Sequence, residues 1–332
     1  MMAKFEPSKE VLSGETADVY FHRTLDILSR EKLNPQAVME VFPCRDGILC
    51  GIEEVTALLQ KVLPVIESGI WALEEGAAMS RKEVVLRIAA PYQSYGLYET
   101  AICGMLSQSS GWATAARECV QAAAGIPVVS FGARHVHPSV AAVMDYAAVI
   151  GGCQGCSTTL GAKLAGIQPS GTMPHALILV MGDTVAASVA FDKYMAPDIA
   201  RVSLVDTFKD EVEESLRVAQ ALGKKLSAVR LDTPRERGGV TVELVKELRA
   251  KLDLVGFNHV GIFVSGGFDA AKIRLFVEQK TPVSGFGVGS NITAAPPIDF
   301  TADLHEVAGK PVAKRGRLPG ITPNPRLKRI II

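Results

Sequence analysis

The chain has 332 residues, of which 48% are apolar and 21% charged. This length and balance predict one large α/β domain or two domains, and they exclude a disordered protein. Thirty-five basic residues balance thirty-five acidic ones, so the chain has no overall field that would attract nucleic acid or an anionic membrane. An anionic ligand would have to be held locally, by backbone amides and a few arginines or lysines.

Neither the amino terminus nor the cysteines suggest export. The opening MMAKFEPSKE contains no hydrophobic run, so we expect no signal peptide and a cytoplasmic protein. No apolar stretch approaches the ~20 residues that cross a bilayer. The six cysteines are typical of reduced thiols. The C-x-x-C pair Cys153 and Cys156 is followed by no further cysteine, so we expect no metal site there.

The first part of the chain mixes short strands and helices. An amphipathic pattern predicts a helix from about Ile52, and residues 82–92 alternate as a strand that ends at Pro91. Residues 95–124 are helical in pattern and rich in alanine, and Gly111 is expected to divide them into two helices.

From residue 126 the chain alternates between short apolar runs and helical patterns. Apolar strands separated by helices predict a parallel sheet buried on both faces. Six or seven such units favour an irregular α/β barrel, with an open doubly wound sheet as the alternative. The tail from Ala294 is expected to pack back on the first domain. The apolar runs are residues 126–131, 147–152, 176–181, 200–205, 226–231, 259–265 and 282–289.

Polar and glycine residues gather after these runs, at the ends where barrel enzymes build their sites. The clusters SGG (Ser265, Gly266, Gly267) and FGVGSN (Gly287, Gly289) would let backbone amides approach a phosphate. Tight turns without a ligand are the alternative interpretation.

Two aspartates also follow strands. Asp232 comes two residues after Arg230 and so shares its strand face. The two carboxylates could bind ribose hydroxyls or a magnesium ion held with phosphate, or stabilise a developing cation. Asp206 could instead cap the next helix.

The segment FGARHVHP offers one aromatic ring and several cations. Phe131 with Arg134 suits a planar, anionic ligand. His135 and His137 have a spacing that permits a metal pair, and His137 before Pro138 could simply start a helix. A further histidine, His175, stands between a Gly-Thr-Met-Pro turn and an apolar run. It is either a turn residue or a titrating group aimed into the site.

In this order, the motifs FGARHVHP, GCSTTLGAKLAGIQPSGTMPHALIL, LVDTF, VRLDT, FVSGGFD and FGVGSN resemble the nicotinate phosphoribosyltransferases, which have the type II phosphoribosyltransferase fold. The resemblance implies an open-faced α/β sandwich, residues 1–96 with the return 295–332, and a barrel domain, residues 97–294. It also implies homodimers or multiples of them with shared sites. The implied reaction joins nicotinate to 5-phosphoribosyl 1-pyrophosphate with Mg²⁺, giving nicotinate mononucleotide and pyrophosphate, coupled in many members to ATP hydrolysis.

The resemblance also implies a role for each motif. Phe131 and Arg134 would border the pyridine ring, and His175 would be phosphorylated by ATP. Asp206, Arg230 and Asp232 would surround the ribose and pyrophosphate. The remaining implied contacts are Ser157 and Thr158 near the base and phosphates, the glycine clusters at the 5-phosphate, and Tyr20, Arg23, Lys314 and Arg315 from the neighbouring chain.

Two features depart from the family pattern. The chain is short, and His135 stands where many members carry a second arginine, which affects carboxylate recognition because histidine is only partly charged near pH 7. A related enzyme for quinolinate or nicotinamide, a non-catalytic phosphoribosyl-binding barrel, and an unrelated phosphate-binding aldolase or isomerase are the alternatives.

Overall fold

The computed structural model describes residues 4–331. The chain divides into two compact units, Met1–Thr114 with Ala295–Ile332, and Ala115–Ala294. The first boundary lies inside one long helix, α4 (Glu99–Ala122). The resemblance places that boundary at residue 96 instead.

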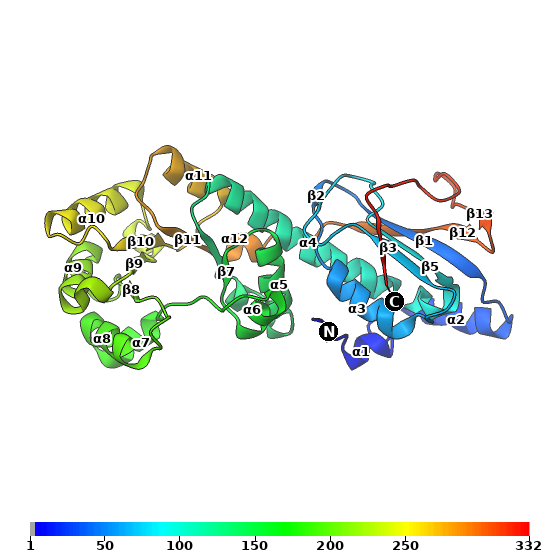
Figure 1. The fold of residues 1–332 in the computed structure, drawn as a ribbon, viewed down its shortest axis with the longest axis horizontal. Coiled ribbons are helices and arrows are strands. Elements are labelled where there is room, and N and C mark those ends of the chain that lie inside the picture. The colour runs from blue at the N-terminus through cyan, green and yellow to red at the C-terminus, as the bar shows by residue number, and fades with distance from the viewer. Residues whose placement is uncertain (1–3, 332) are drawn as a thin grey trace. The chain divides into compact units, whose positions relative to one another are not determined.

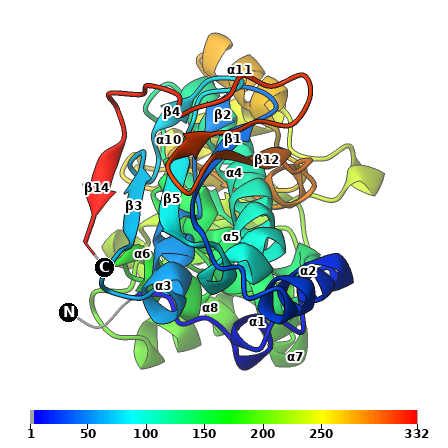
Figure 2. The same cartoon turned by 90° about the vertical axis from the view of Figure 1, so that its right-hand side faces the viewer.

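The first unit is built on a six-stranded sheet in the order β13-β12-β1-β5-β3-β14, with antiparallel pairing throughout. The carboxyl-terminal tail supplies three of these strands, as expected from its return, and Figure 2 shows β14 beside β3. The strands are β1 (Gln36–Pro43), β3 (Gly69–Ala72), β5 (Leu86–Pro91), β12 (Phe300–Val307), β13 (Lys310–Pro311) and β14 (Lys328–Ile330), and a small separate pair is β2 (Gly47–Ile48) with β4 (Ala78–Met79).

The core of this unit lies between the sheet and its helices. Strand β5 alternates between buried and half-buried residues, and α3 buries Ile52, Val55, Leu58 and Leu59 in the same core. Burying each such side chain contributes roughly 1.5–3 kcal/mol. The helices are α1 (Lys9–Leu12), α2 (Val19–Arg30), α3 (Ile52–Val62) and the first part of α4.

The second unit is a curled sheet of six parallel strands in the order β7-β6-β11-β10-β9-β8 (Figure 1). The two end strands do not pair, so the barrel is open between β7 and β8. This confirms the irregular α/β barrel. The strands are β6 (Val128–Ser130), β7 (Gly155–Cys156), β8 (Val202–Leu204), β9 (Ala228–Leu231), β10 (Gly261–Val264) and β11 (Gly285–Val288).

Helices follow the strands of this sheet. Figure 1 shows α9, α10 and α11 on the outside of its curve. Three helices fill the stretch between β7 and β8, where no strand forms. The helices are the last part of α4, α5 (Pro138–Ile150), α6 (Thr159–Ala165), α7 (His175–Met181), α8 (Thr184–Tyr194), α9 (Glu211–Leu222), α10 (Val242–Leu254), α11 (Ala270–Glu278) and α12 (Ser290–Thr293).

Two of the apolar runs are not strands. Residues 147–152 contain the last turn of α5, and residues 176–181 belong to α7. In α7 only Ile178 is buried, while Leu179 and Val180 are exposed, and Gly182 at φ +77° ends the helix. A short apolar run cannot by itself distinguish a strand from a helix.

Gly111 does not divide α4, which runs unbroken from Glu99 to Ala122. A Cβ atom at Gly111 would lie 2.6 Å from the carbonyl oxygen of Pro296. The glycine therefore allows the returning chain to pack closely against the helix, which offsets its low helix propensity.

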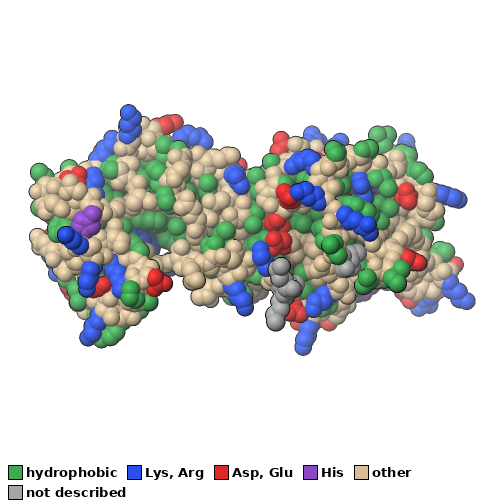
Figure 3. Space-filling view, in the orientation of Figure 1, with side chains coloured by type: hydrophobic (Ala, Val, Ile, Leu, Met, Phe, Trp, Pro, Cys, Tyr) green, Lys and Arg blue, Asp and Glu red, His purple; other side chains and the backbone are tan. Residues whose placement is uncertain are grey.

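On the face shown in Figure 3, basic and acidic side chains are interspersed, in keeping with the balanced charge. Among residues 4–331, no single helix is long and apolar enough to cross a bilayer. Helices α7 and α8 reach the length and apolar composition of a membrane span only when they are counted together, and the chain bends by 109° between them.

Candidate functional site

A cavity of about 490 Å³ lies within the second unit, where the segments after five of the parallel strands converge. Of the site residues predicted for this unit, only Thr158 and Asp206 do not line the cavity. Thr158 is hydrogen-bonded to Asp145, and Asp206 is hydrogen-bonded to His175 on the wall. The predicted residues on its wall are Phe131, Arg134, His135, Ser157, His175, Arg230, Asp232, Ser265, Gly266, Gly267, Gly287 and Gly289.

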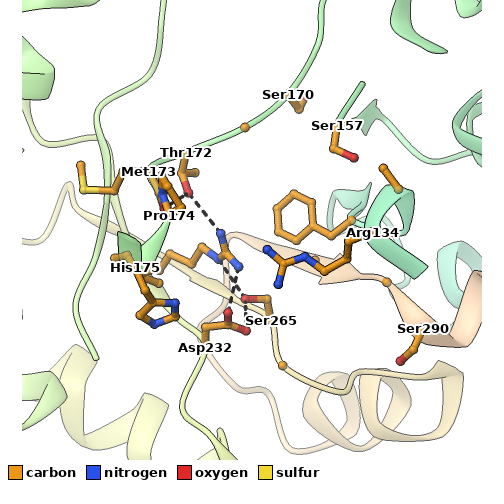
Figure 4. Close-up of a pocket in the computed structure, with 18 of the residues that line it drawn as sticks. Arg134, Ser157, Ser170, Thr172, Met173, Pro174, His175, Asp232, Ser265 and Ser290 are labelled. Atoms are coloured by element: carbon orange, nitrogen blue, oxygen red, sulfur yellow. Dashed lines mark hydrogen bonds and ion pairs between the residues drawn. The ribbon is translucent and has the colours of Figure 1, made fainter. Parts of the chain in front are cut away.

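Arg230, at the end of β9, connects three segments of the cavity wall. Its guanidinium donates from Nε to Ser265 Oγ (2.9 Å), from Nη1 to Thr172 Oγ1 (3.2 Å) and from Nη2 to Asp232 Oδ2 (3.1 Å). Ser265 Oγ in turn donates to Asp232 Oδ1 at 2.9 Å. Figure 4 shows Thr172, Asp232 and Ser265 facing this common point. Burial lowers the pKa of Arg230, and the neighbouring Asp232 opposes the shift.

Asp206 lies behind the wall and fixes two of its residues. Its side chain is 1% exposed; Oδ1 lies 3.0 Å from His175 Nε2, and Oδ2 accepts from the amide of Asp232 at 2.8 Å. Burial raises the pKa of Asp206, and the contact with His175 opposes this. Asp206 does not cap α9, because Asp210 accepts the amide hydrogens of that helix.

One wall of the cavity suits a flat ring. Phe131 lies with its ring centroid 4.8 Å from the Arg230 guanidinium carbon. Arg134 also lines the cavity, and among residues 4–331 it has no hydrogen bond or ion pair. Its guanidinium is therefore available to an anion.

The imidazole of His137 caps α5 by accepting from the amide of Ser139, which confirms its interpretation as a helix-start residue.

The two glycine clusters bring backbone close to the cavity. Gly266 and Gly267 have φ of +88° and +73°, a conformation that favours glycine. A Cβ atom at Gly287 would lie 2.4 Å from the Phe131 ring. One at Gly289 would lie 3.0 Å from the Phe131 carbonyl oxygen and 3.2 Å from His135 Nε2. His135 thus lies against the glycine cluster that the resemblance assigns to phosphate.

Several residues in and around the cavity are not among those predicted from the sequence. Thr172 accepts from Arg230, and Arg235 lies 3.3 Å from where a Gly267 Cβ would be. Buried Asp145 accepts from the Thr158 amide. Thr172 stands in the Gly-Thr-Met-Pro turn that precedes His175. Asp145 is the one charged residue in the apolar sequence of α5, a signal that could have identified it.

The other predicted residues belong to the first unit. Tyr20 and Lys314 line a separate cavity of about 400 Å³ together with Asp18 and Glu99. Lys314 pairs with Asp303 at 2.9 Å. Arg23 and Arg315 lie outside that cavity. Among residues 4–331, no group of three or more His, Cys, Asp or Glu side chains could hold a metal ion.

Two family models match the chain, the quinolinate phosphoribosyl transferase N-terminal domain over residues 18–110 and its C-terminal domain over residues 112–303. The chain is 34% identical over 241 residues to a nicotinate phosphoribosyltransferase of Mycobacterium tuberculosis, and 29% identical over 231 residues to one of Bacillus subtilis. These matches cover 71% and 68% of this chain but 51% and 46% of those proteins. The chain spans about half the length of the curated relatives it matches.

Solved structures share the fold. A nicotinate-nucleotide pyrophosphorylase from Pyrococcus furiosus matches with a TM-score of 0.87 and 46% identity, over 96% of this chain and 81% of that one. Human nicotinic acid phosphoribosyltransferase matches with a TM-score of 0.74 and 19% identity, over 92% and 77%. At that identity the human structure shows the fold alone.

An open α/β barrel with strand-end glycine clusters, joined to an antiparallel sheet unit, defines the class of type II phosphoribosyltransferases. The chain belongs to this class. The N-terminal model of the quinolinate phosphoribosyl transferase family falls within the first unit, and the C-terminal model covers the second unit and continues to residue 303.

Proposed function

We propose that the protein is a nicotinate phosphoribosyltransferase, which makes nicotinate mononucleotide and pyrophosphate from nicotinate and 5-phosphoribosyl 1-pyrophosphate. The observation that carries the proposal is the unpaired Arg134 beside the stacked Phe131 and Arg230, in a cavity that also contains the glycine clusters. One wall suits a planar ring with one carboxylate, and the glycine clusters suit a phosphate. The names of the curated relatives support this choice of base.

The charges of the cavity favour a base with a single carboxylate. Its wall contains two arginines and no lysine, and Arg230 is committed to Asp232, Ser265 and Thr172. Of these two arginines, Arg134 is the one whose guanidinium is left for the base, while Arg235 lies beside Gly267 in a glycine cluster. A second carboxylate, as in quinolinate, would call for a further cation, because an unpaired charge is costly in a partly desolvated site. Among residues 4–331, the wall within one chain supplies none, so that cation would have to come from the second copy.

In the proposed reaction the ring nitrogen of nicotinate forms a bond to the anomeric carbon while the bond from that carbon to pyrophosphate oxygen breaks. Phe131 and Arg134 orient the base. Asp206 and Asp232 supply negative charge near the sugar, where positive charge develops. Each of their four carboxylate oxygens already has a partner, namely His175, the Asp232 amide, Ser265 or Arg230. We infer that Mg²⁺ enters bound to the phosphoribosyl pyrophosphate.

We further propose that ATP phosphorylates His175 and that this step is coupled to turnover. The imidazole lines the cavity and is anchored by Asp206. A second copy of the chain would complete the site with Tyr20, Arg23, Lys314 and Arg315. The cavity that Tyr20 and Lys314 line in the first unit is consistent with this role.

A second candidate is phosphoribosyl transfer to quinolinate. The matching family models favour it, and so does the name of the Pyrococcus furiosus neighbour. Transfer to quinolinate also releases carbon dioxide, whereas transfer to nicotinate does not.

The test uses purified protein with phosphoribosyl pyrophosphate and Mg²⁺, in separate reactions with nicotinate, quinolinate or nicotinamide, each with and without ATP. We expect nicotinate mononucleotide from nicotinate and a higher rate with ATP. Nicotinate mononucleotide and carbon dioxide from quinolinate, with no product from nicotinate, would establish the second candidate. Binding of nicotinate mononucleotide without turnover of any base would indicate a non-catalytic barrel.

A further inference from the structure

Asp145, in α5, is a fully buried carboxylate behind the cavity wall. Among residues 4–331, no lysine, arginine or histidine lies within ion-pair distance of it. Three donors satisfy it instead. Oδ1 accepts from Ser130 Oγ at 2.9 Å, and Oδ2 accepts from the Thr158 amide at 2.8 Å and from Ser157 Oγ at 3.4 Å.

A buried charge without a cation is costly, and it persists only where hydrogen bonds compensate for the lost water. Hydrogen bonds to an ionised acceptor are shorter and stronger than those between neutral groups. The carboxylate therefore holds its three donors more firmly than a neutral side chain would.

The donors of Asp145 come from two segments that form the cavity. Ser130 ends β6 and immediately precedes Phe131, while Ser157 and Thr158 follow β7. Ser157 lines the cavity together with Phe131. The carboxylate of Asp145 thus connects the segment after β6, which carries the Phe131 ring, to the segment after β7, which carries Ser157. Both segments face the same cavity.

Close packing leaves this carboxylate little freedom. A Cβ atom at Gly161, in α6, would lie 2.6 Å from Asp145 Cβ and 2.6 Å from Thr158 Oγ1. Helix α6 therefore approaches α5 as closely as a glycine allows. Its first turn is fixed by Thr158, which accepts from the Gly161 amide at 3.1 Å while its own amide donates to Asp145.

We propose that Asp145 is a positioning residue for the base subsite. Asp145 sets the distance between the segment that begins at Phe131 and the segment that contains Ser157. In this way it sets the affinity for the pyridine base without contacting the base. The proposal rests on the proposed function, because it assigns the space between these segments to the base.

The test compares Asp145→Asn with a matched variant, Glu211→Gln. Glu211 is also buried, and it accepts from Thr233 Oγ1 at 2.9 Å, next to Asp232 on the sugar side; unlike Asp145 it has a cation nearby, Arg237 at 3.8 Å. For Asp145→Asn we expect the KM for nicotinate to rise about tenfold, as for loss of one charge-assisted hydrogen bond, and the KM for phosphoribosyl pyrophosphate to change less than about twofold. For Glu211→Gln we expect the KM for phosphoribosyl pyrophosphate to rise more than the KM for nicotinate.

Calorimetry with nicotinate mononucleotide and with ribose 5-phosphate gives a second measurement that needs no turnover. If wild-type protein turns over no nicotinate, the proposed function fails, while Asp145 is still tested by whether the Asp145→Asn variant loses affinity for the nucleotide more than for the sugar phosphate. Equal losses for both ligands, or lowered thermal stability with unchanged affinities, would overturn the positioning role. Should Asp145→Asn not fold, Ser130→Ala removes one of the three donors. That variant must also lose affinity for the nucleotide more than for the sugar phosphate, by a smaller factor.

Discussion

The imidazole of His175 meets the carboxylate of Asp206, with Nε2 and Oδ1 3.0 Å apart. An ionised carboxylate can only accept a hydrogen bond, so Nε2 carries the hydrogen, and in the neutral form of the ring the lone pair is on Nδ1. Asp206 is itself fixed by the amide of Asp232. The ring nitrogen of His175 that is engaged is therefore determined by a residue 31 positions along the chain.

A first prediction concerns this histidine. With ATP and Mg²⁺, we expect a phosphoryl group on Nδ1 of His175, because Nε2 is engaged by Asp206. Phosphorus NMR of the intact protein distinguishes the two phosphohistidine isomers. His175→Ala should remove the stimulation by ATP while leaving some basal transfer. Equal stimulation in the variant and the wild type would remove His175 from this role.

Asp206→Asn is the companion to that experiment. The variant keeps the shape of the side chain but loses the charge that orients the imidazole, so phosphate incorporation should fall about tenfold or more and appear on both ring nitrogens. Incorporation on Nδ1 alone at the wild-type rate would contradict the orienting role of Asp206.

A second prediction separates the two neighbours Arg134 and His135. Arg134 is unpaired in the cavity, whereas His135 Nε2 lies against Gly289. Arg134→Gln should raise the KM for nicotinate about tenfold to a hundredfold, as expected for loss of a charge-assisted contact. His135→Gln should act mainly on the KM for phosphoribosyl pyrophosphate. Steady-state kinetics with each substrate varied in turn distinguishes them, and the reverse pattern would assign the carboxylate to His135.

A third prediction tests the phosphate cradle. Gly289→Val should raise the KM for phosphoribosyl pyrophosphate about tenfold or more, because its Cβ would meet the Phe131 carbonyl oxygen at 3.0 Å. Gly289→Ala should give a smaller change. Gly171→Ala is the control, since Gly171 also lines the cavity but has no atom within 4 Å of its Cβ position. An unchanged KM in Gly289→Val would refute this placement.

A fourth prediction concerns the stability of the first unit. Burial, with nearby Glu75, raises the pKa of Glu54 to about 7. A carboxyl whose pKa is raised by folding favours the folded state fully below its unfolded pKa, and this contribution is lost as pH rises from about 4.5 to about 7. Glu54→Gln should therefore raise Tm more at pH 8 than at pH 5, with a difference on the order of 2–3 kcal/mol in unfolding free energy.

Glu53→Gln is the control, because the side chain of Glu53 is 38% exposed and pairs with Lys4 at 3.1 Å. We expect its effect on Tm to be small, as for most surface ion pairs. Thermal melts of both variants at the two pH values provide the comparison. A gain for Glu54→Gln that is equal at pH 5 and pH 8 would show that Glu54 is ionised alike in the folded and unfolded protein.

Much of the barrel and its cavity could be predicted because the signals are local. Four short apolar runs lead to Phe131, Asp206, Asp232 and Ser265. Each run ends in polar or glycine residues close to the end of its strand. Parallel strands bring those ends together without any knowledge of the contacts. The glycine clusters were recognisable for the same reason.

What could not be predicted depends on contacts between distant residues. The run 176–181 has no local feature that distinguishes a strand from α7; the difference lies in Ile178 packing against Met173 and Leu204. The bond from Arg230 to Thr172 spans 58 positions. Gly111 resembles a helix break in the sequence because its partner, Pro296, arrives from the far end of the chain.

The gap in the barrel has a consequence for self-association. A closed barrel has no free edges, whereas an open one exposes two rows of backbone groups that can pair with other chains and lead to aggregation. Here the strands at those edges are β7, with two residues, and β8, with three, and the Cys156 carbonyl oxygen already accepts from the Ser170 amide. Such short edges give an incoming strand little to pair with, so the gap that accommodates α7 and His175 carries a low risk of aggregation.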